Sequence, residues 1–384
     1  MNINFHYYTV KSAALAAGLP ETQAQIVASY SQFVDDFNTR RAILTREGAL
    51  DPDCELVRRG WATREDDCWK IPLVTTGFVG WLDEVRLMSE QRQREVLIPF
   101  HFRPMNRIDR EKRYWVEHCD FEERDDHTIV EALRGCREEY RAAAARRADI
   151  LQLQPILLHI GVLMHIFADT YAHEWFNGFW NRSINNFKVT RALRHDAGGD
   201  VDVTDKYTRF SSFPALGHTT VDTAPDDSNL SFRMELETID EAKQKRVVVR
   251  ERDNTAFFRD AAVQIYRYLY RCAHAHAPDA AEEQGFATRV TRGLLLNNHD
   301  ERALEGLWGG VFPGYSYGYS KQEMMGKLFP GADRAGVLDA LMQPPSAHET
   351  EESADTVAVE EISREFYSFT LYAAELRQEV QEEQ

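Results

Sequence analysis

Three residues of metal-ligand type recur at four-residue spacing in the most apolar segment of the chain: His165, Asp169 and His173. At about 100° per residue they fall on one stripe of a helix. The other faces of this helix are apolar, so we expect it to be buried. A buried carboxylate is costly unless it is paired or bound to a metal. The pattern therefore indicates either a metal site or a buried Asp–His hydrogen-bond network, and this helix alone leaves both open.

One ion cannot take all three side chains while the helix stays intact. A rise of about 1.5 Å per residue separates His165 from His173 by roughly 12 Å along the axis. We therefore expect His165 and Asp169 to share one ion and His173 to bind a neighbouring one, as in the multinuclear sites of hydrolases.

Further ligands have to come from other segments. A helix predicted over residues 21–38 places Asp36 at the border of its apolar stripe and Asp35 on the opposite, solvated side, which makes Asp36 the better ligand. His218 is followed by Asp222 after four residues and by Asp226 after eight. Each candidate alone is more typical of a core or surface residue, but their joint occurrence favours a metal site. The predicted ligands are His6, Asp36, His101, His165, Asp169, His173, His218 and Asp222.

This ordered set resembles the ligand order of the zinc-dependent phospholipase C and single-strand-specific nuclease superfamily. Several short motifs also look like an uncharacterised bacterial family over roughly residues 2–260: Phe5-His6-Tyr7-Tyr8, Val34-Asp35-Asp36, Pro99-Phe100-His101-Phe102, Ala168-Asp169-Thr170-Tyr171-Ala172-His173 and Gly217-His218 with Pro225-Asp226.

The first resemblance implies a cluster of one to three Zn²⁺ ions that cuts a phosphodiester. By position, Asp36, His101, His165 and Asp169 would form one site, and Asp169 would bridge to a second ion held by His6. The third ion would be bound by His173, His218 and Asp222. The ions would lower the pKa of a bound water, with Asp36 as the general base. A small phosphodiester or a phospholipid would be the substrate.

Two other readings remain open. Adjacent His-Asp pairs at His195-Asp196 and His299-Asp300 make a helical His-Asp phosphohydrolase conceivable. The serious alternative is a non-catalytic protein, namely a helical effector, immunity factor or scaffold in which the His/Asp cluster is structural. Its C-terminal helix would then be the interaction module for a protein partner.

Periodicity predicts a mainly α fold with a small β-hairpin inserted at about residues 230–252. The first resemblance implies that its large helical domain is of the phospholipase C-like type. This domain would span residues 1–343, followed by an acidic linker at 344–358 and a C-terminal helix within 359–384. Two prolines argue against a helix over 98–104. The main helices are predicted at 11–39 with a break at 18–20, and at 81–95, 127–148, 151–180, 255–276, 280–296 and 359–381.

Composition limits the partners. The 384 residues carry 45 Lys and Arg against 62 Asp and Glu, a formal charge of −17. This charge disfavours bulk nucleic-acid binding, because the surface repels polyanions. The sequence predicts no signal peptide and no transmembrane segment, so we expect a cytoplasmic protein, although delivery by a signal-free secretion route would leave the same sequence.

Overall fold

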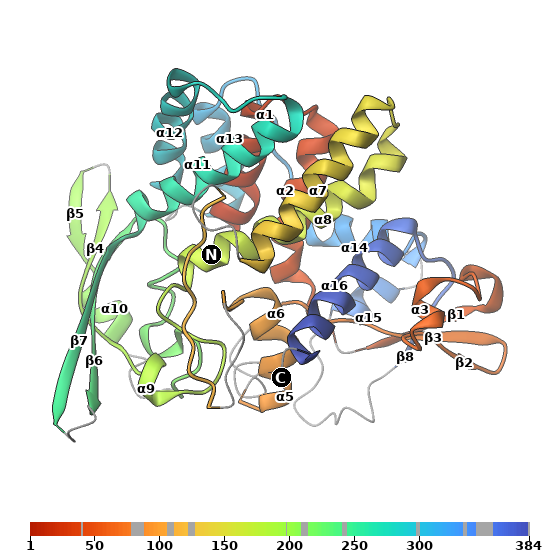
Figure 1. The fold of residues 1–384 in the computed structure, drawn as a ribbon, viewed down its shortest axis with the longest axis horizontal. Coiled ribbons are helices and arrows are strands. Elements are labelled where there is room, and N and C mark those ends of the chain that lie inside the picture. The colour runs from red at the N-terminus through yellow and green to blue at the C-terminus, as the bar shows by residue number, and fades with distance from the viewer. Residues whose placement is uncertain are drawn as a thin grey trace.

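The computed structural model of the protein describes residues 1–39, 41–77, 88–105, 111–121, 127–196, 198–208, 214–239, 244–296, 300–332, 336–342 and 356–382. Its helices form a central body, and two β-sheets lie on opposite sides of that body (Figure 1).

Helix α8 (Ile150–Ala172), which carries the His/Asp stripe, is the centre of the helical body. Four helices pack against it: α2 (Glu21–Asp36), α7 (Thr128–Ala145), α11 (Asn254–Ala273) and α16 (Arg364–Glu382). Among the described residues α8 is the one helix long and apolar enough to cross a membrane, but 61% of its most apolar window is buried. That burial fits the core helix of a soluble protein.

The N-terminal segment confirms the predicted pair of helices joined by a tight turn. The π-helix η1 (Asn4–Thr9) continues into α1 (Val10–Ala16), and Gly18, with a φ of 89°, turns the chain toward α2. A φ in this left-handed region favours glycine. The turn brings the start of the chain back beside α8, which η1 contacts directly.

The other helical segments are shorter or lie toward the C-terminus. Helix α12 packs on α11 and η1, while α14 contacts α2 and α16. Their bounds are η2 (Glu47–Ala49), α3 (Glu55–Arg58), α5 (Glu90–Arg92), η3 (Gln93–Leu97), α6 (Ile98–Phe100), α9 (Arg182–Asn185), α10 (Thr204–Thr208), η4 (Thr219–Val221), α12 (Ala280–Leu294), α13 (Glu301–Val311), α14 (Lys321–Leu328) and α15 (Val337–Met342).

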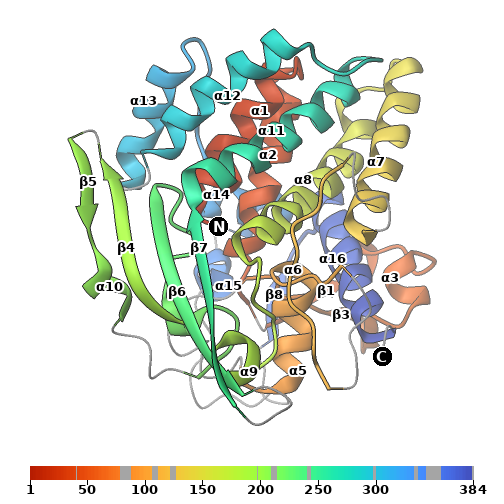
Figure 2. The ribbon, with the colours of Figure 1, turned by 60° about the vertical axis from the view of Figure 1, so that its left-hand side comes forward.

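Both sheets have four strands. The first has the order β2-β3-β1-β8, with only the β1–β8 pair parallel; its strands are β1 (Ala42–Arg46), β2 (Thr63–Glu65), β3 (Cys68–Pro72) and β8 (Thr356–Val359). The second is antiparallel throughout in the order β5-β4-β6-β7, which Figure 2 brings forward; its strands are β4 (Lys188–Asp196), β5 (Gly199–Asp202), β6 (Leu230–Ile239) and β7 (Lys245–Asp253).

The prediction of a mainly α fold with one small hairpin is wrong. Of the residues that the structure describes, 54% are helical and 16% lie in strands, a mixed α/β fold. The predicted hairpin exists as β6 and β7, but β4 and β5 extend it into a sheet. The sequence concealed β4 because a β-bulge between Val189 and Arg191 interrupts the alternation that marks a strand. Gly198 lies at the turn from β4 to β5, and Gly199 is the first residue of β5.

The prediction that residues 98–104 form no helix was also wrong in part. Helix α6 (Ile98–Phe100) continues the π-helix η3, and Pro99 lies in the first turn of α6. A π-helical register shifts the acceptors by one residue, and Phe102 N–H accordingly bonds to Leu97 O at 2.7 Å. A proline, which lacks its own N–H, is tolerated there. Of the helix predicted over 81–95, residues 81–87 lie outside the described part.

The C-terminal helix is part of the core. Phe366 and Phe369 of α16 are buried, and the buried guanidinium of Arg103 binds Glu379 at 2.9 Å. Strand β8, just before this helix, joins the first sheet beside β1. Most of the predicted acidic linker, residues 344–355, lies outside the described residues.

Candidate metal centre

The stripe on α8 forms the floor of a buried His/Asp cluster. Asp169 is 1% exposed, and Nε2 of His165, one turn earlier on the helix, lies 3.3 Å from its carboxylate. Nδ1 of His173 lies 3.7 Å from the same carboxylate. The helix ends at Ala172, and His173 is its C-cap, so His173 leaves the helical path and points into a neighbouring group of ligands.

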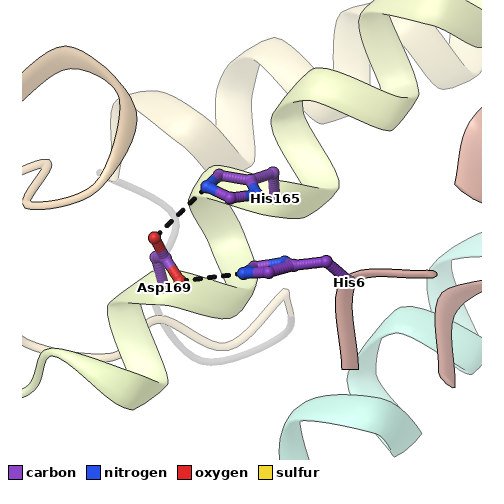
Figure 3. A group of neighbouring side chains, drawn as sticks. All are labelled: His6, His165 and Asp169. Carbon is purple, nitrogen blue, oxygen red and sulfur yellow. Dashed lines mark ion pairs between the residues drawn. The ribbon is translucent and has the colours of Figure 1, made fainter. Parts of the chain in front are cut away.

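His6 reaches the cluster from the π-helix at the start of the chain. Its Nε2 lies 3.2 Å from Asp169, and its ring stacks on His165 with the centroids 3.9 Å apart. Figure 3 shows the two imidazoles pointing at opposite oxygens of Asp169. His6 is fully buried, and neither of its ring nitrogens has a well-directed hydrogen bond to any described residue.

His101 and Asp35 complete this side of the cluster. Nδ1 of His101 is 3.1 Å from Asp169, and the Asp35 carboxylate lies 3.7 Å from His165 and 3.9 Å from His101. These residues form two overlapping triads of close ligand atoms: His6, His165 and Asp169, and Asp35, His101 and His165. Within each triad all the ligand atoms lie within 4.8 Å of one another.

A third triad lies beside the C-terminal end of α8. It consists of His173, His218 and Asp226. Both imidazoles place Nε2 at 3.3 Å from Asp226. As the helical spacing predicts, His173 belongs to a different triad from His165 and Asp169.

Two carboxylates that the sequence favoured do not join these triads. Asp36 accepts hydrogen bonds from Tyr319 at 2.5 Å and from Gln32, while Asp35 faces the histidines. The apolar-stripe argument failed because the face of α2 toward α8 runs through small Ser31, whose carbonyl contacts His165, and Asp35 lies one turn later on that face. The prediction that Asp35 points away from the cluster was therefore wrong: its side chain is 29% exposed and lies toward the histidines.

Asp226 takes the place predicted for Asp222. Asp222 has a φ of 53°, and only its backbone carbonyl contacts His218, at Nδ1. Its carboxylate is in none of the triads. The spacing of eight residues from His218 and the Pro225-Asp226 motif were the available signals for Asp226.

Four of the five imidazoles are oriented by backbone carbonyls. Ser31, Thr76, His101 and Asp222 offer carbonyl oxygens to His165 Nδ1, His101 Nε2, His173 Nδ1 and His218 Nδ1, respectively. A carbonyl only accepts, so the ring nitrogen facing it carries the hydrogen. In a neutral ring the other nitrogen then presents a lone pair to the cluster, the arrangement usual for metal-ligating histidines.

The contact between His165 and His101 shows why the cluster needs a cation. His165 Nε2 and His101 Nδ1 lie 3.3 Å apart, and both are the nitrogens left without hydrogen in neutral rings. Two lone pairs facing each other beside two carboxylates repel, unless a proton or a metal ion lies between them. The site is therefore built around positive charge.

Burial sets the protonation states. Desolvation lowers the pKa of His165 to about 4 and also lowers the pKa of His6 and His173, so these rings are neutral at neutral pH. Burial alone would raise the pKa of Asp169, but the Met1 ammonium and nearby histidines hold it well below its usual value. Burial, reinforced by Asp169, raises the pKa of Asp35 well above its usual value.

The α-amino group of Met1 is a cation within the cluster. It lies 2.7 Å from Asp169 and 3.2 Å from Asp226, and so links the first and third groups. Desolvation opposes its charge, but Asp169, Asp226 and Asp35 raise its pKa to about 11. One ammonium cannot balance all these carboxylates.

A cavity of about 680 Å³ opens onto the cluster, with Asp35, Asp226 and the Met1 backbone in its wall. Arg302 and Lys321 contribute positive charge to the same wall. The aromatic, glycine-rich loop between α13 and α14 also lines it, through Gly318 and Tyr319. Tyr7 fixes this loop by accepting from Gly318 N–H at 2.9 Å.

The adjacent His-Asp pairs do not contribute to the cluster within the described residues. His195 lies on the second sheet and contacts Asp200 at 2.8 Å and Ser231 at 2.6 Å, while Asp196 pairs with Arg194. His299 lies outside the described part.

Comparison with known proteins places the chain in a family. Searches of curated proteins and of solved structures each return no significant match, and so give no support to the resemblance to the phospholipase C and nuclease superfamily. The sequence model of a family of unknown function, DUF6765, matches residues 1–383. The chain therefore belongs to the family of unknown function DUF6765.

Proposed function

We propose that the protein is a metal-dependent hydrolase of phosphodiester bonds. The observation that carries the proposal is the set of imidazole nitrogens, each fixed by a backbone carbonyl on its far side, that converge with Asp35, Asp169 and Asp226 below an open cavity. Mixed imidazole and carboxylate ligands suit Zn²⁺ better than Mg²⁺ or Ca²⁺.

The residues present fit such ions. His6 is a fully buried imidazole without a well-directed hydrogen bond among the described residues. Burying ring nitrogens in this way is costly unless a ligand binds them. His6, His165 and Asp169, together with His101, would hold one or two ions. His173, His218 and Asp226 would hold another. When bound, the ions would lower the pKa of a water toward neutrality and neutralise the phosphate oxygens.

The protein's own groups would supply the remaining chemistry. Asp35 lies in the cavity wall with its carboxylate within 4 Å of His6, His101 and His165, where it could accept a proton from a water held at the cluster. Asp35 rather than Asp36 would therefore be the general base. Lys321 and Arg302 would attract the anionic substrate into an otherwise acidic cavity.

The size and charge of the cavity favour a small substrate. A volume of about 680 Å³ fits a drug-sized molecule or a lipid head group. The formal charge of −17 opposes binding of a nucleic-acid polymer at the surface. A small phosphodiester or a phospholipid remains the proposed substrate.

Hydrolysis of bis(4-nitrophenyl) phosphate tests the proposal. We expect untagged protein to release nitrophenolate, chelation to remove the activity, and Zn²⁺ to restore it. At a free ion concentration of 100 Kd, binding should also stabilise the fold by about 2.7 kcal/mol, seen as a higher Tm. A Tm that responds to metal without any turnover would favour a structural cluster. No response in either measurement would reject both.

Asparagine substitutions separate the two neighbouring aspartates. Asp35→Asn should lower kcat by about 100-fold or more, because a general base contributes that much. Asp36→Asn should lower it less than about threefold, because an amide can still accept from Tyr319. Steady-state kinetics on the two variants measures the contrast. Equal losses, or a larger loss for Asp36→Asn, would contradict the assignment.

A further inference from the structure

Arg252, near the end of β7, is a buried cation beside the third triad. It is 7% exposed, and its guanidinium donates to four acceptors. Two of these are the last carbonyls of α8, Tyr171 O at 2.8 Å and Ala172 O at 3.0 Å. A third is Pro225 O at 3.2 Å, in the residue just before Asp226. One side chain thus joins the backbone segments that carry two of the three triad members, His173 and Asp226.

The neighbours of Arg252 hold the same loop. Asn254 accepts from Arg252 Nε at 2.7 Å and donates to the carbonyls of Ala224 and Asp227, each at 2.8 Å. Thr255 donates to Ser228 O at 2.9 Å. The junction between β7 and α11 therefore fixes the chain on both sides of Asp226.

The chemistry of the site calls for arginine. A buried charge is costly unless its hydrogen bonds are satisfied, and the C-terminal end of a helix offers unpaired carbonyls and a negative dipole. The planar fork of a guanidinium reaches several carbonyls at fixed angles, which an ammonium cannot do. The rings of Phe232, Trp175 and Phe257 surround it, with their centroids 5.1 to 5.6 Å from Arg252 Cζ.

We propose that Arg252 is a positioning residue that sets the geometry of the His173, His218 and Asp226 triad. It ties the end of α8, where His173 lies, to the loop that carries Asp226. Through Arg252 the second sheet holds the end of α8 and the loop of Asp226 in place. The inference rests on the proposed function for the metal itself, but the bracing of the loop is independent of it.

Variants at two arginines of the same strand test this role. In Arg252→Met and Arg252→Lys we expect the third triad to lose 10- to 100-fold in Zn²⁺ affinity, the usual effect of removing an outer-shell partner. The site at His6, His165 and Asp169 should keep its affinity. Amide exchange over residues 222–228 should speed up. The Arg252→Lys variant keeps the charge without the planar fork, so its Zn²⁺ affinity and amide exchange should lie between those of the wild type and Arg252→Met. It also provides the test if the methionine variant does not fold. Arg250→Met, at an exposed neighbour that contacts Trp175, should match the wild type.

Isothermal titration with Zn²⁺ and hydrogen exchange read by mass spectrometry measure the two effects. Wild-type affinity together with unchanged exchange in a folded Arg252 variant would overturn the inference. A wild type that binds no Zn²⁺ would reject the proposed function, while the exchange data would still decide whether Arg252 fixes the loop. A uniform loss at both sites, equal in Arg250→Met, would show a general loss of structure and also overturn it.

Discussion

Replacing Asp169 by asparagine is expected to abolish metal binding at His6, His101 and His165, and with it hydrolysis. Among the described carboxylates, Asp169 alone contacts His6, His101, His165, His173 and the Met1 ammonium, at 2.7 to 3.7 Å. We expect Zn²⁺ affinity to fall more than about 100-fold, since even an outer-shell loss costs 10- to 100-fold. Without metal, the variant should be destabilised by about 3–5 kcal/mol, because it leaves a buried ammonium short of a partner.

Two further variants make this result specific. Asp226→Asn should remove only the ion of the third triad, because Asp226 contacts His173 and His218 but none of the other described ring nitrogens. Asp149 is the exposed N-cap of the helix that carries Asp169. The Asp149→Asn variant should keep full metal content, since asparagine also caps helices well. Calorimetric titration and urea unfolding measure both quantities. Full metal content in a folded Asp169→Asn variant would contradict the account.

Substituting alanine for Gly161 is expected to destabilise the fold more than any other single methyl addition in α8. A Cβ at this position would lie 2.5 Å from Val27 O and 2.9 Å from the Tyr30 side chain. Helices α2 and α8 cross so closely there that the backbone of α2 would have to move. Such overpacking costs about 1–3 kcal/mol or more. The displacement would also shift Ser31 and Asp35, so activity should fall with stability.

Gly135 of α7 provides the matched control. No atom lies within 4 Å of a Cβ built there, and the residue is exposed in the interior of a helix. Gly135→Ala should therefore stabilise the protein by about 0.5–1 kcal/mol, because alanine restricts the unfolded chain and favours the helix. Urea unfolding of both variants should give opposite signs. A neutral Gly161→Ala would show that the close crossing of α2 and α8 is not as described.

The sequence predicted the longer helices well but missed the shorter α13, α14 and α15, and it predicted the strands poorly. The apolar periodicity of α2, α7, α8, α11 and α12 is local, so it is legible without knowledge of the packing. Strand pairing is not local: β8 joins β1 across more than 300 positions of the chain, and a bulge hides β4. Only the hairpin of β6 and β7, whose strands are neighbours in sequence, was found.

The site was predictable where it depended on spacing along one helix. His165, Asp169 and His173 could be placed from the helical repeat alone, and His6, His101 and His218 from the apolar context or motif around each one. The choice between Asp35 and Asp36 depended on which face of α2 packs on α8, and Asp226 depended on a loop fixed by Arg252 and Asn254. Neither arrangement leaves a periodic signal in the sequence.

The central claim is that the His/Asp cluster holds divalent metal. Elemental analysis of purified protein that retains Met1 as its free N-terminus tests it most directly, since an added tag would displace the buried α-amino group. We predict at least two equivalents of a divalent transition metal per chain, falling to about one or fewer in Asp169→Asn, because the third triad does not include Asp169. Wild-type protein with less than about a tenth of an equivalent, unchanged after incubation with Zn²⁺ and desalting, would contradict the account and leave a polar core closed by the Met1 ammonium.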